Sequence, residues 1–150
     1  MPETEVLSRK LGRTDIKVSA LALGGHHLGN TKNEAESIQI VNEALEGGIT
    51  AFDNCWEYHL GETELMVGKA LKGKRDRAIV MTKVCTHGRD KALAMQMLEE
   101  SLRRLQTDHI DIWQIHGVSF YNDPELFIRP NGRQARSGGP DDKGLHARAR

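Results

Sequence analysis

Short apolar runs alternate with segments whose apolar residues recur at helical spacing along most of the chain. The apolar runs occupy residues 20–23, 49–52, 78–83 and 110–116. Their length, and the glycine and polar residues around them, are typical of buried strands. They begin at intervals of roughly 30 residues, the size of a strand plus its crossover helix. The sequence therefore predicts a repeated strand and helix unit.

The segments between these runs predict helices. Asn33 followed by Glu36 resembles a capping box, and apolar residues then recur at helical spacing until Gly47 stops the helix. A second helix is predicted over residues 62–71, and Asp90 is the expected cap of a third. Each predicted helix joins one apolar run to the next, as a crossover connection does.

The predicted second and third helices are amphipathic, so each has an expected buried face. Leu65 and Met66 are expected on the buried face of the second helix. In the third helix, Arg103 and Arg104 are expected on the solvent side, opposite the leucines. These assignments follow from spacing alone.

The fold class predicted by this alternation is α/β, with parallel strands. Residues 6–9 and 16–18 alternate and flank a turn, which predicts a β-hairpin ahead of the first unit. All four strand ends carry polar or glycine-rich residues, and no Gly-x-Gly-x-x-Gly motif follows any strand. Both features favour half of a TIM-type (β/α)₈ barrel over an open doubly wound sheet.

Composition narrows the function classes. The formal net charge is zero, with 21 basic and 21 acidic residues, which argues against nucleic acid and an anionic membrane surface as partners. We expect a cytosolic protein, because no secretory signal or membrane-spanning run is found. The two cysteines, Cys55 and Cys85, fit a reducing compartment.

Candidate chemistry follows three of the strand ends. The second apolar run ends on Asp53, with Tyr58 five residues later, and the third and fourth end on Lys83 and His116. Taken singly, each side chain has an ordinary structural explanation, such as capping, packing or solvent exposure. Parallel strands collect their carboxyl ends on one rim, so the sequence predicts that the four side chains lie near one another.

Residues 6–128 resemble the N-terminal half of an aldo-keto reductase. The motifs that carry the resemblance are Leu11-Gly12-Arg13-Thr14, Val18 to Gly24, Phe52-Asp53 with Tyr58, Gly61-Glu62, Gly68-Lys69-Ala70-Leu71, Thr82-Lys83, Ser101 to Leu105, and Ile110 to His116. The resemblance implies a (β/α)₈ barrel that binds NADP(H) at its C-terminal rim. It also implies a small carbonyl or alcohol substrate.

The resemblance implies a catalytic tetrad of Asp53, Tyr58, Lys83 and His116. Hydride transfer to a carbonyl carbon leaves negative charge on the oxygen, so a proton donor and a polarising hydrogen bond must lie beside it. A phenol has a pKa of about 10, and a neighbouring ammonium lowers it. Tyr58 is then the expected general acid, Lys83 its activating cation, Asp53 the anchor of that cation, and His116 the group that orients the carbonyl.

The resemblance further places Gly24, Gly25 and His26, together with Asp53, on the nicotinamide side of the cofactor. The pair His26-His27 after the two glycines departs from the usual family pattern, which leaves the shape of the substrate open.

Two other function classes stay open. Histidines and cysteines near the strand ends could ligate zinc, as in a metal-dependent hydrolase built on a barrel. These residues are His26, His27, Cys55, His59, Cys85, His87 and His116. No metal site is predicted, because no pair has His-x-His or His-x-x-x-His spacing on one element. A non-catalytic binding protein with a reductase-like fold is the third class.

The end of the chain differs from the rest. Residues 131–150 contain five glycines and prolines in all, four arginines and one large aliphatic residue, Leu145. We expect residues 1–128 to form the barrel-like part and residues 129–150 a disordered tail, whose composition is typical of a shifted reading frame. Because the second half of a barrel does not follow, we expect the chain to be inactive alone.

Overall fold

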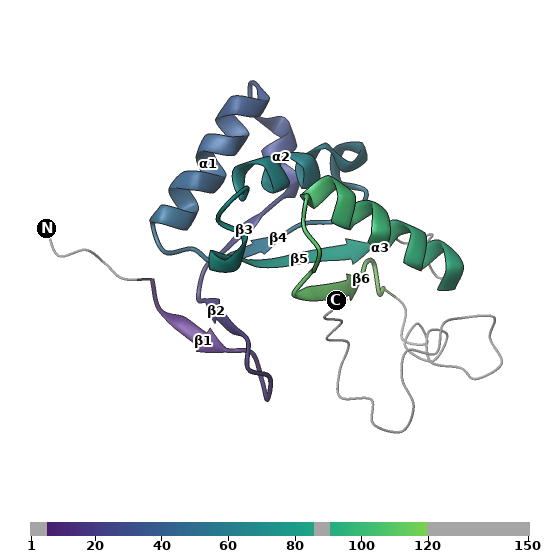
Figure 1. Ribbon diagram of the computed structural model, residues 1–150, viewed down its shortest axis with the longest axis horizontal. Helices are drawn as coiled ribbons and strands as arrows, with labels where there is room; N and C mark the ends of the chain where they lie inside the picture. The colour runs from purple at the N-terminus through teal and green to yellow at the C-terminus, as the bar shows by residue number, and fades with distance from the viewer. Residues whose placement is uncertain (1–5, 86–90, 120–150) are drawn as a thin grey trace, which may run out of the picture.

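The computed structural model of the chain describes residues 6–85 and 91–119 (Figure 1). Its strands are β1 (Ser8–Lys10), β2 (Lys17–Ser19), β3 (Ala22–Gly24), β4 (Ala51–Asp53), β5 (Ile79–Val84) and β6 (Ile112–Ile115). Its α-helices are α1 (Glu34–Glu46), α2 (Glu62–Ala70) and α3 (Lys91–Leu105). Three 3₁₀-helices complete the described part: η1 (His26–Asn30), η2 (Tyr58–Gly61) and η3 (Arg75–Arg77).

The main sheet is parallel, as the alternation predicted. Its strand order is β3-β4-β5-β6, so each strand pairs with the next one along the chain. Figure 1 shows α1, α2 and α3 on the same side of this sheet. The predicted hairpin is confirmed as an antiparallel pair of β1 and β2. The predicted α/β class is therefore correct.

The side of the sheet that faces the helices holds the hydrophobic core. Phe52 of β4 pairs in register with Val80 of β5, and both pack against Val41 of α1, Val67 of α2 and Leu98 of α3 in one cluster. Full burial of one such side chain contributes about 1.5–3 kcal/mol. This cluster is the main reason that three short crossover units stay together.

The opposite side of the sheet is less buried. Successive side chains of a strand point to opposite faces, so Asp53 and Lys83 lie on the side away from Phe52 and Val80. In β5 the helix-facing residues are buried and the alternate ones, including Lys83, are partly exposed. The polar side chains at the strand ends therefore share the face that the helices leave uncovered.

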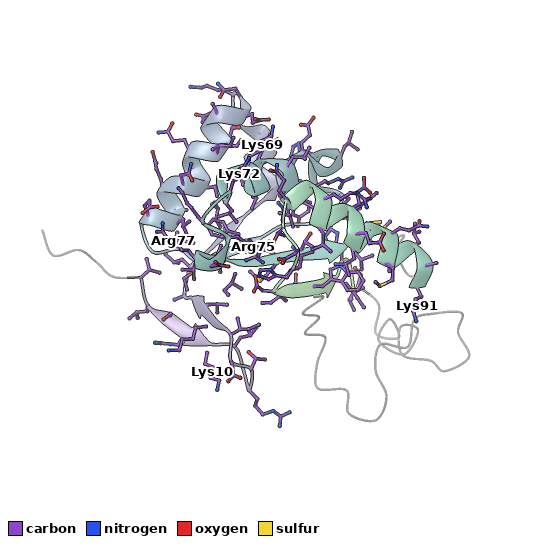
Figure 2. All side chains as sticks on the ribbon, viewed as in Figure 1. Lys10, Lys69, Lys72, Arg75, Arg77 and Lys91 are labelled. Atoms are coloured by element: carbon purple, nitrogen blue, oxygen red, sulfur yellow. The ribbon has the colours of Figure 1, made fainter. Side chains whose placement is uncertain are left out.

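The two ends of the strands have different polar groups. At the amino end of β5, Arg75 forms an ion pair with Asp111 at 2.6 Å between Nη2 and Oδ2, and the same carboxylate accepts from the Val80 amide at 2.9 Å. Arg75 is labelled in Figure 2. At the amino end of β4, the Ser19 hydroxyl accepts from the amides of Thr50 and Ala51 and so fixes the hairpin. These contacts join elements and leave the carboxyl ends free for chemistry.

The predicted cap of the first helix is confirmed. The Asn33 Oδ1 atom accepts from the Glu36 amide at 3.0 Å, and the Glu36 carboxylate accepts in turn from the Lys32 amide at 2.8 Å. The helix ends at Glu46, directly before Gly47. The expected cap at Asp90 lies outside the described residues.

Two expectations about burial are wrong. The first strand begins at Ala22, two residues later than predicted, and it is not buried, since β4 is its only neighbour in the described sheet. In α2, Leu65 is exposed and Met66 is only half-buried. The buried face of α2 holds Gly68 instead, because a β-carbon there would lie 2.6 Å from the carbonyl carbon of Leu105. Close contact between helix α2 and the end of α3 decides which face is buried.

In the described part of the chain, no helix combines the length and apolar character needed to cross a membrane. The predicted tail, residues 129–150, lies outside the described residues, as does the chain from residue 120.

Candidate functional site

The site is centred on an ion pair between two neighbouring strands. Asp53 is the last residue of β4. The third strand was predicted to end on Lys83, but β5 continues for one more residue, to Val84. The Lys83 Nζ atom lies 2.7 Å from Asp53 Oδ1 and 2.7 Å from the backbone carbonyl oxygen of Asn54. The Lys83 side chain is 14% exposed and the Asp53 side chain 36% exposed. The ammonium is therefore held by two acceptors at the edge of solvent.

Tyr58 lies beside this ion pair. It begins η2, and its amide donates to the Cys55 carbonyl, which turns the chain back over the strand ends. The Lys83 ammonium lies 5.2 Å from the centre of the Tyr58 ring. The Tyr58 hydroxyl has no hydrogen-bond partner among residues 6–85 and 91–119, while the two hydrogen bonds of the Lys83 ammonium go to Asp53 and the Asn54 carbonyl.

The turn that carries Tyr58 is strained. His59 and Leu60 have φ angles of 48° and 57°, in the left-handed region that favours glycine. Such residues cost about 1–3 kcal/mol each and cluster at functional sites. Gly29 makes room for this turn, because a β-carbon at that position would lie 2.2 Å from the His59 ring. Packing against η1 therefore stabilises the turn, since the backbone preferences of His59 and Leu60 do not favour it.

His116 follows β6 and is fixed by its backbone, since its amide donates to the Val84 carbonyl at 3.1 Å. Its ring meets the Tyr58 ring edge to face, with 5.9 Å between the centres. Its Nδ1 atom is in close hydrogen-bond contact with the Glu57 carboxylate and lies 3.4 Å from the Cys55 sulfur. All four predicted tetrad residues thus lie at one end of the sheet, joined by the Asp53 pair and by ring contacts.

The residues expected beside the nicotinamide lie at the end of β3. Gly24 pairs with Asp53 in the sheet register, and a β-carbon at Gly24 would have no atom within 4 Å. A β-carbon at Gly25 would lie 2.7 Å from Asn54 Oδ1, so only glycine fits there. The His26 ring lies 5.0 Å from the Tyr58 ring, centre to centre. The end of β3 therefore borders Tyr58 and has open space above Gly24.

Asn54 connects the site to helix α2. Its buried Oδ1 atom accepts from the Thr63 hydroxyl at 2.8 Å and from the Cys55 amide at 2.9 Å. The backbone N–H of Asn54 donates to the Met81 carbonyl at 2.9 Å, which extends the pairing of β4 with β5 past Asp53. Its Nδ2 atom is buried and has no hydrogen-bond partner in the part of the chain that the structure describes.

A buried charge pair lies under the site and was missed in the sequence. Glu64 of α2 is fully buried; its carboxylate accepts from the Thr82 hydroxyl at 2.7 Å and from Arg104 Nη1 at 3.3 Å. Burial raises the pKa of Glu64, against the opposing effect of hydrogen bonds from Thr82 and Ser101 and of the Arg104 charge. The expectation that Arg104 faces solvent is wrong, because its guanidinium forms an ion pair with this buried carboxylate.

Arg104 also supports the strand end that leads to Tyr58. Its Nη1 atom donates to the Trp56 carbonyl at 2.7 Å, and its guanidinium lies 5.0 Å from the Trp56 ring centre. The Trp56 Nε1 atom donates to Glu100 at 2.8 Å, and Glu100 accepts from Arg104 at 2.8 Å as well. Helix α3 thereby holds the segment between β4 and η2.

The cysteines and histidines near the strand ends separate into groups. Cys55 lies with His116 and with Glu57, which sequence spacing did not select, while the rings of His27 and His59 each lie near that of His26. His87 lies outside the described residues. Burial raises the pKa of the Cys55 thiol to about 11.

Glu57 and Glu64 illustrate what the sequence could and could not reveal. The pairing of β4 with β5 continues past Asp53, so Cys55 and Glu57 follow Asp53 at two-residue steps on the same face. That alternation was a usable signal for Glu57. No comparable signal existed for Glu64, because a glutamate in an amphipathic helix is ordinarily exposed.

Comparison with known proteins agrees with this geometry. The sequence model of the Aldo/keto reductase family matches residues 20–130. The chain is 36% identical to aldo-keto reductase YhdN of Bacillus subtilis over 126 residues, which cover 77% of this chain and 38% of that protein. It is 35% identical to L-galactose dehydrogenase of Arabidopsis thaliana over 127 residues, which cover 78% of this chain and 40% of that protein.

Solved structures give the same result. The holo form of an aldo-keto reductase from Bacillus halodurans superposes with a TM-score of 0.72 at 38% identity, covering 81% of this chain and 43% of that one. An aldo/keto reductase from Klebsiella pneumoniae in complex with NADP and acetate superposes with a TM-score of 0.62 at 32% identity, covering 66% and 35%. The parallel sheet and hairpin thus match part of that (β/α)₈ barrel fold, and the chain spans about two fifths of the length of these relatives.

Proposed function

Because the chain belongs to the aldo/keto reductase family, we propose that it carries the proton-donating part of a site that interconverts carbonyls and alcohols with NADP(H). The observation that carries this proposal is the Lys83 ammonium, which bonds Asp53 at 2.7 Å and lies 5.2 Å from the centre of the Tyr58 ring. His116 is the fourth member, with its ring 5.9 Å from that of Tyr58. The whole protein's activity is part of the proposal.

Each residue has one task in this proposal. Tyr58 donates the proton that the carbonyl oxygen gains, and its hydroxyl is free of competing partners within the described chain. Lys83 stabilises the phenolate left behind, since an ammonium beside a phenol favours its ionised form. Asp53 fixes Lys83 in place, and His116 orients the carbonyl oxygen through its second ring nitrogen. A solvent proton then restores the phenol.

The residues at the end of β3 fit the cofactor. When bound, NADP(H) supplies or accepts the hydride. The open space above Gly24, beside Asp53, supports a flat ring lying against the end of the strand. Gly25 and His26 follow directly, at the start of η1. Two structural relatives from Klebsiella pneumoniae were solved with NADP or NADPH, which supports the choice of cofactor.

A small carbonyl compound or alcohol is the proposed substrate, and the cytosol the proposed location. The matched segment covers 38% of YhdN, so turnover is tested with the rest of that protein's length supplied.

The test is a chimera in which residues 1–118 replace the matched segment of YhdN. We expect NADPH oxidation that depends on a carbonyl substrate, and a fall in kcat of about 10²–10⁴ in the Tyr58→Phe variant, the usual contribution of a positioned proton donor. Trp56→Phe, two residues away on the helix side, is the matched control and retains most of the activity.

Two outcomes would contradict the proposal. A folded chimera that binds NADPH without oxidising it in the presence of carbonyls would favour the non-catalytic binding protein. An unchanged kcat in Tyr58→Phe would show that another group donates the proton.

A further inference from the structure

Three side chains with metal-ligating atoms converge beside Tyr58. They are the Cys55 sulfur, a Glu57 carboxylate oxygen and His116 Nδ1, which all lie within 4.8 Å of one another. Spacing along the sequence did not predict this group, because its members come from two different strand ends. The extension of β4 carries Cys55 and Glu57, and His116 follows β6.

The backbone holds these ligands before any ion binds. On the β4 side, the Asn54 and Trp56 amides donate to the Met81 and Lys83 carbonyls, which fixes Cys55 between them. On the other side, the His116 amide donates to β5 at 3.1 Å. Backbone hydrogen bonds to β5 therefore fix both segments that carry the three ligands. A site built on a sheet in this way loses little conformational entropy on binding.

The separations suit a tetrahedral ion. Zinc bonds of about 2.3 Å to sulfur and about 2.0–2.2 Å to nitrogen and oxygen place neighbouring ligand atoms roughly 3.3–3.7 Å apart. The Cys55 sulfur lies 3.4 Å from His116 Nδ1 and 3.9 Å from Glu57 Oε1. The Glu57 and His116 atoms touch through a hydrogen bond and need to open slightly for the ion to enter.

Charge and access also favour a cation. A thiolate, a carboxylate and a neutral imidazole together balance the charge of a divalent ion, which a partly buried site requires. The Lys83 ammonium at the same end of the sheet is already bound by Asp53 and the Asn54 carbonyl. The side chains of His116 and Glu57 are 30% and 31% exposed, so the ion has a route from solvent although Cys55 is buried.

We propose that Cys55, Glu57 and His116 bind Zn²⁺, with water in the fourth position. The mixture of soft sulfur, imidazole and carboxylate ligands suits zinc rather than magnesium or calcium. Binding exchanges the Cys55 thiol proton, released to solvent, for a sulfur–metal bond, and it breaks the contact between His116 Nδ1 and Glu57. The proton of that hydrogen bond leaves Nδ1, so the neutral imidazole carries its proton on Nε2 and binds the ion through Nδ1. The ion then links the segment before Tyr58 to the end of β6. Because only Nδ1 is used, the site does not depend on the reductase proposal.

The test uses Co²⁺ as a spectroscopic probe of the full chain, freed of metal with a chelator. We expect a sulfur-to-cobalt charge-transfer band and the intense visible bands of four-coordinate Co²⁺, both removed by stoichiometric Zn²⁺. Cys55→Ser should abolish the charge-transfer band, and Glu57→Gln should weaken Co²⁺ binding at least about tenfold, the usual scale for disturbing a metal site. Far-ultraviolet circular dichroism confirms that each variant keeps the wild-type fold.

Cys85→Ser is the matched control, because Cys85 is the other buried cysteine and its sulfur lies against Met97, 3.7 Å from Sδ. That variant should keep both the spectrum and the affinity. The proposal is overturned if Cys85→Ser removes the charge-transfer band, if Cys55→Ser retains it, or if urea-unfolded chain gives the same spectrum. Six-coordinate spectra without a sulfur band would also overturn it.

Discussion

The two faces of the parallel sheet contrast most clearly in the segment from Phe52 to Glu57. Phe52, Asn54 and Trp56 contact the helix side, where they meet the core, Thr63 and Glu100 respectively. Asp53 and Glu57 contact Lys83 and His116 on the other side. Adjacent residues of one segment therefore serve different purposes.

The contrast shows how a short sequence holds both a fold and a reactive site. On the helix side every described polar group of this segment except Asn54 Nδ2 has a partner, and apolar residues fill the remaining space. On the other side Asp53 and Glu57 are half-exposed, although Cys55 between them is buried. We expect substitutions on the helix side to change stability strongly and those on the open side to change chemistry with little effect on stability.

The largest effect on stability is expected from Arg104→Met. This change leaves the fully buried Glu64 carboxylate without its cation, and breaking a buried pair in this way costs about 3–5 kcal/mol. Urea unfolding of the full chain, followed by tryptophan fluorescence, gives the free energy of unfolding.

Arg103→Met is the matched control, since Arg103 is exposed on the same turn of α3, and we expect a change within about 0.5 kcal/mol. Adding Glu64→Gln to Arg104→Met should recover part of the loss. Equal effects of the two arginine substitutions would show that the Glu64 pair does not join the helices.

The pH dependence of stability should also depend on Glu64. Burial raises its pKa in the folded state, so the folded chain retains this proton to higher pH than the unfolded chain does. The contribution of Glu64 is therefore greatest below the pKa of an unfolded glutamate and is lost as the pH rises through the folded pKa. The Glu64→Gln variant lacks this titration, so its free energy of unfolding should fall less with rising pH than that of wild type. Its stability relative to wild type should therefore increase from acid to neutral pH. A constant difference would contradict the raised pKa.

A smaller loss is expected from Gly68→Ala, which tests the contact between α2 and α3. The added methyl group would lie 2.6 Å from the Leu105 carbonyl carbon, so the helices must separate, at a cost of about 1–3 kcal/mol. Thermal unfolding of the variant measures this cost. At Gly73, after the end of α2, a β-carbon would meet no atom, although its φ of 74° adds strain of its own. A Gly68→Ala protein as stable as wild type would mean that α2 and α3 pack less closely.

The contrast between the faces also explains what could be predicted from the sequence. The strands, the hairpin and the cap at Asn33 were predictable because each depends on local periodicity or on a local hydrogen bond. The buried face of α2 was not, because it is set by the close approach of Gly68 to Leu105, a contact between residues far apart in the chain. Hydrophobic spacing predicted that Leu65 is buried, because leucine is more hydrophobic than glycine, but the Leu65 side chain is exposed to solvent.

The candidate site shows the same division. Asp53, Lys83 and His116 were predictable as neighbours because parallel strands bring their carboxyl ends together. Arg104 was predicted on the wrong side, because its position depends on Glu64, a charge that no periodic pattern marks as buried. The roles assigned to the tetrad stay predictions.

The smallest effect on stability is expected from Tyr58→Phe, which separates stability from chemistry most directly. The Tyr58 hydroxyl has no hydrogen-bond partner among the described residues, and its ring contacts survive the change, so the free energy of unfolding should shift by no more than about 0.5 kcal/mol. Trp56→Phe, on the opposite face, loses the hydrogen bond to Glu100 and should cost about 0.5–1.5 kcal/mol. Urea unfolding of both variants gives the comparison. If Tyr58→Phe is the more destabilising change, then the open face also holds the fold together, because removing a hydroxyl without a partner should cost less than removing the indole N–H that donates to Glu100.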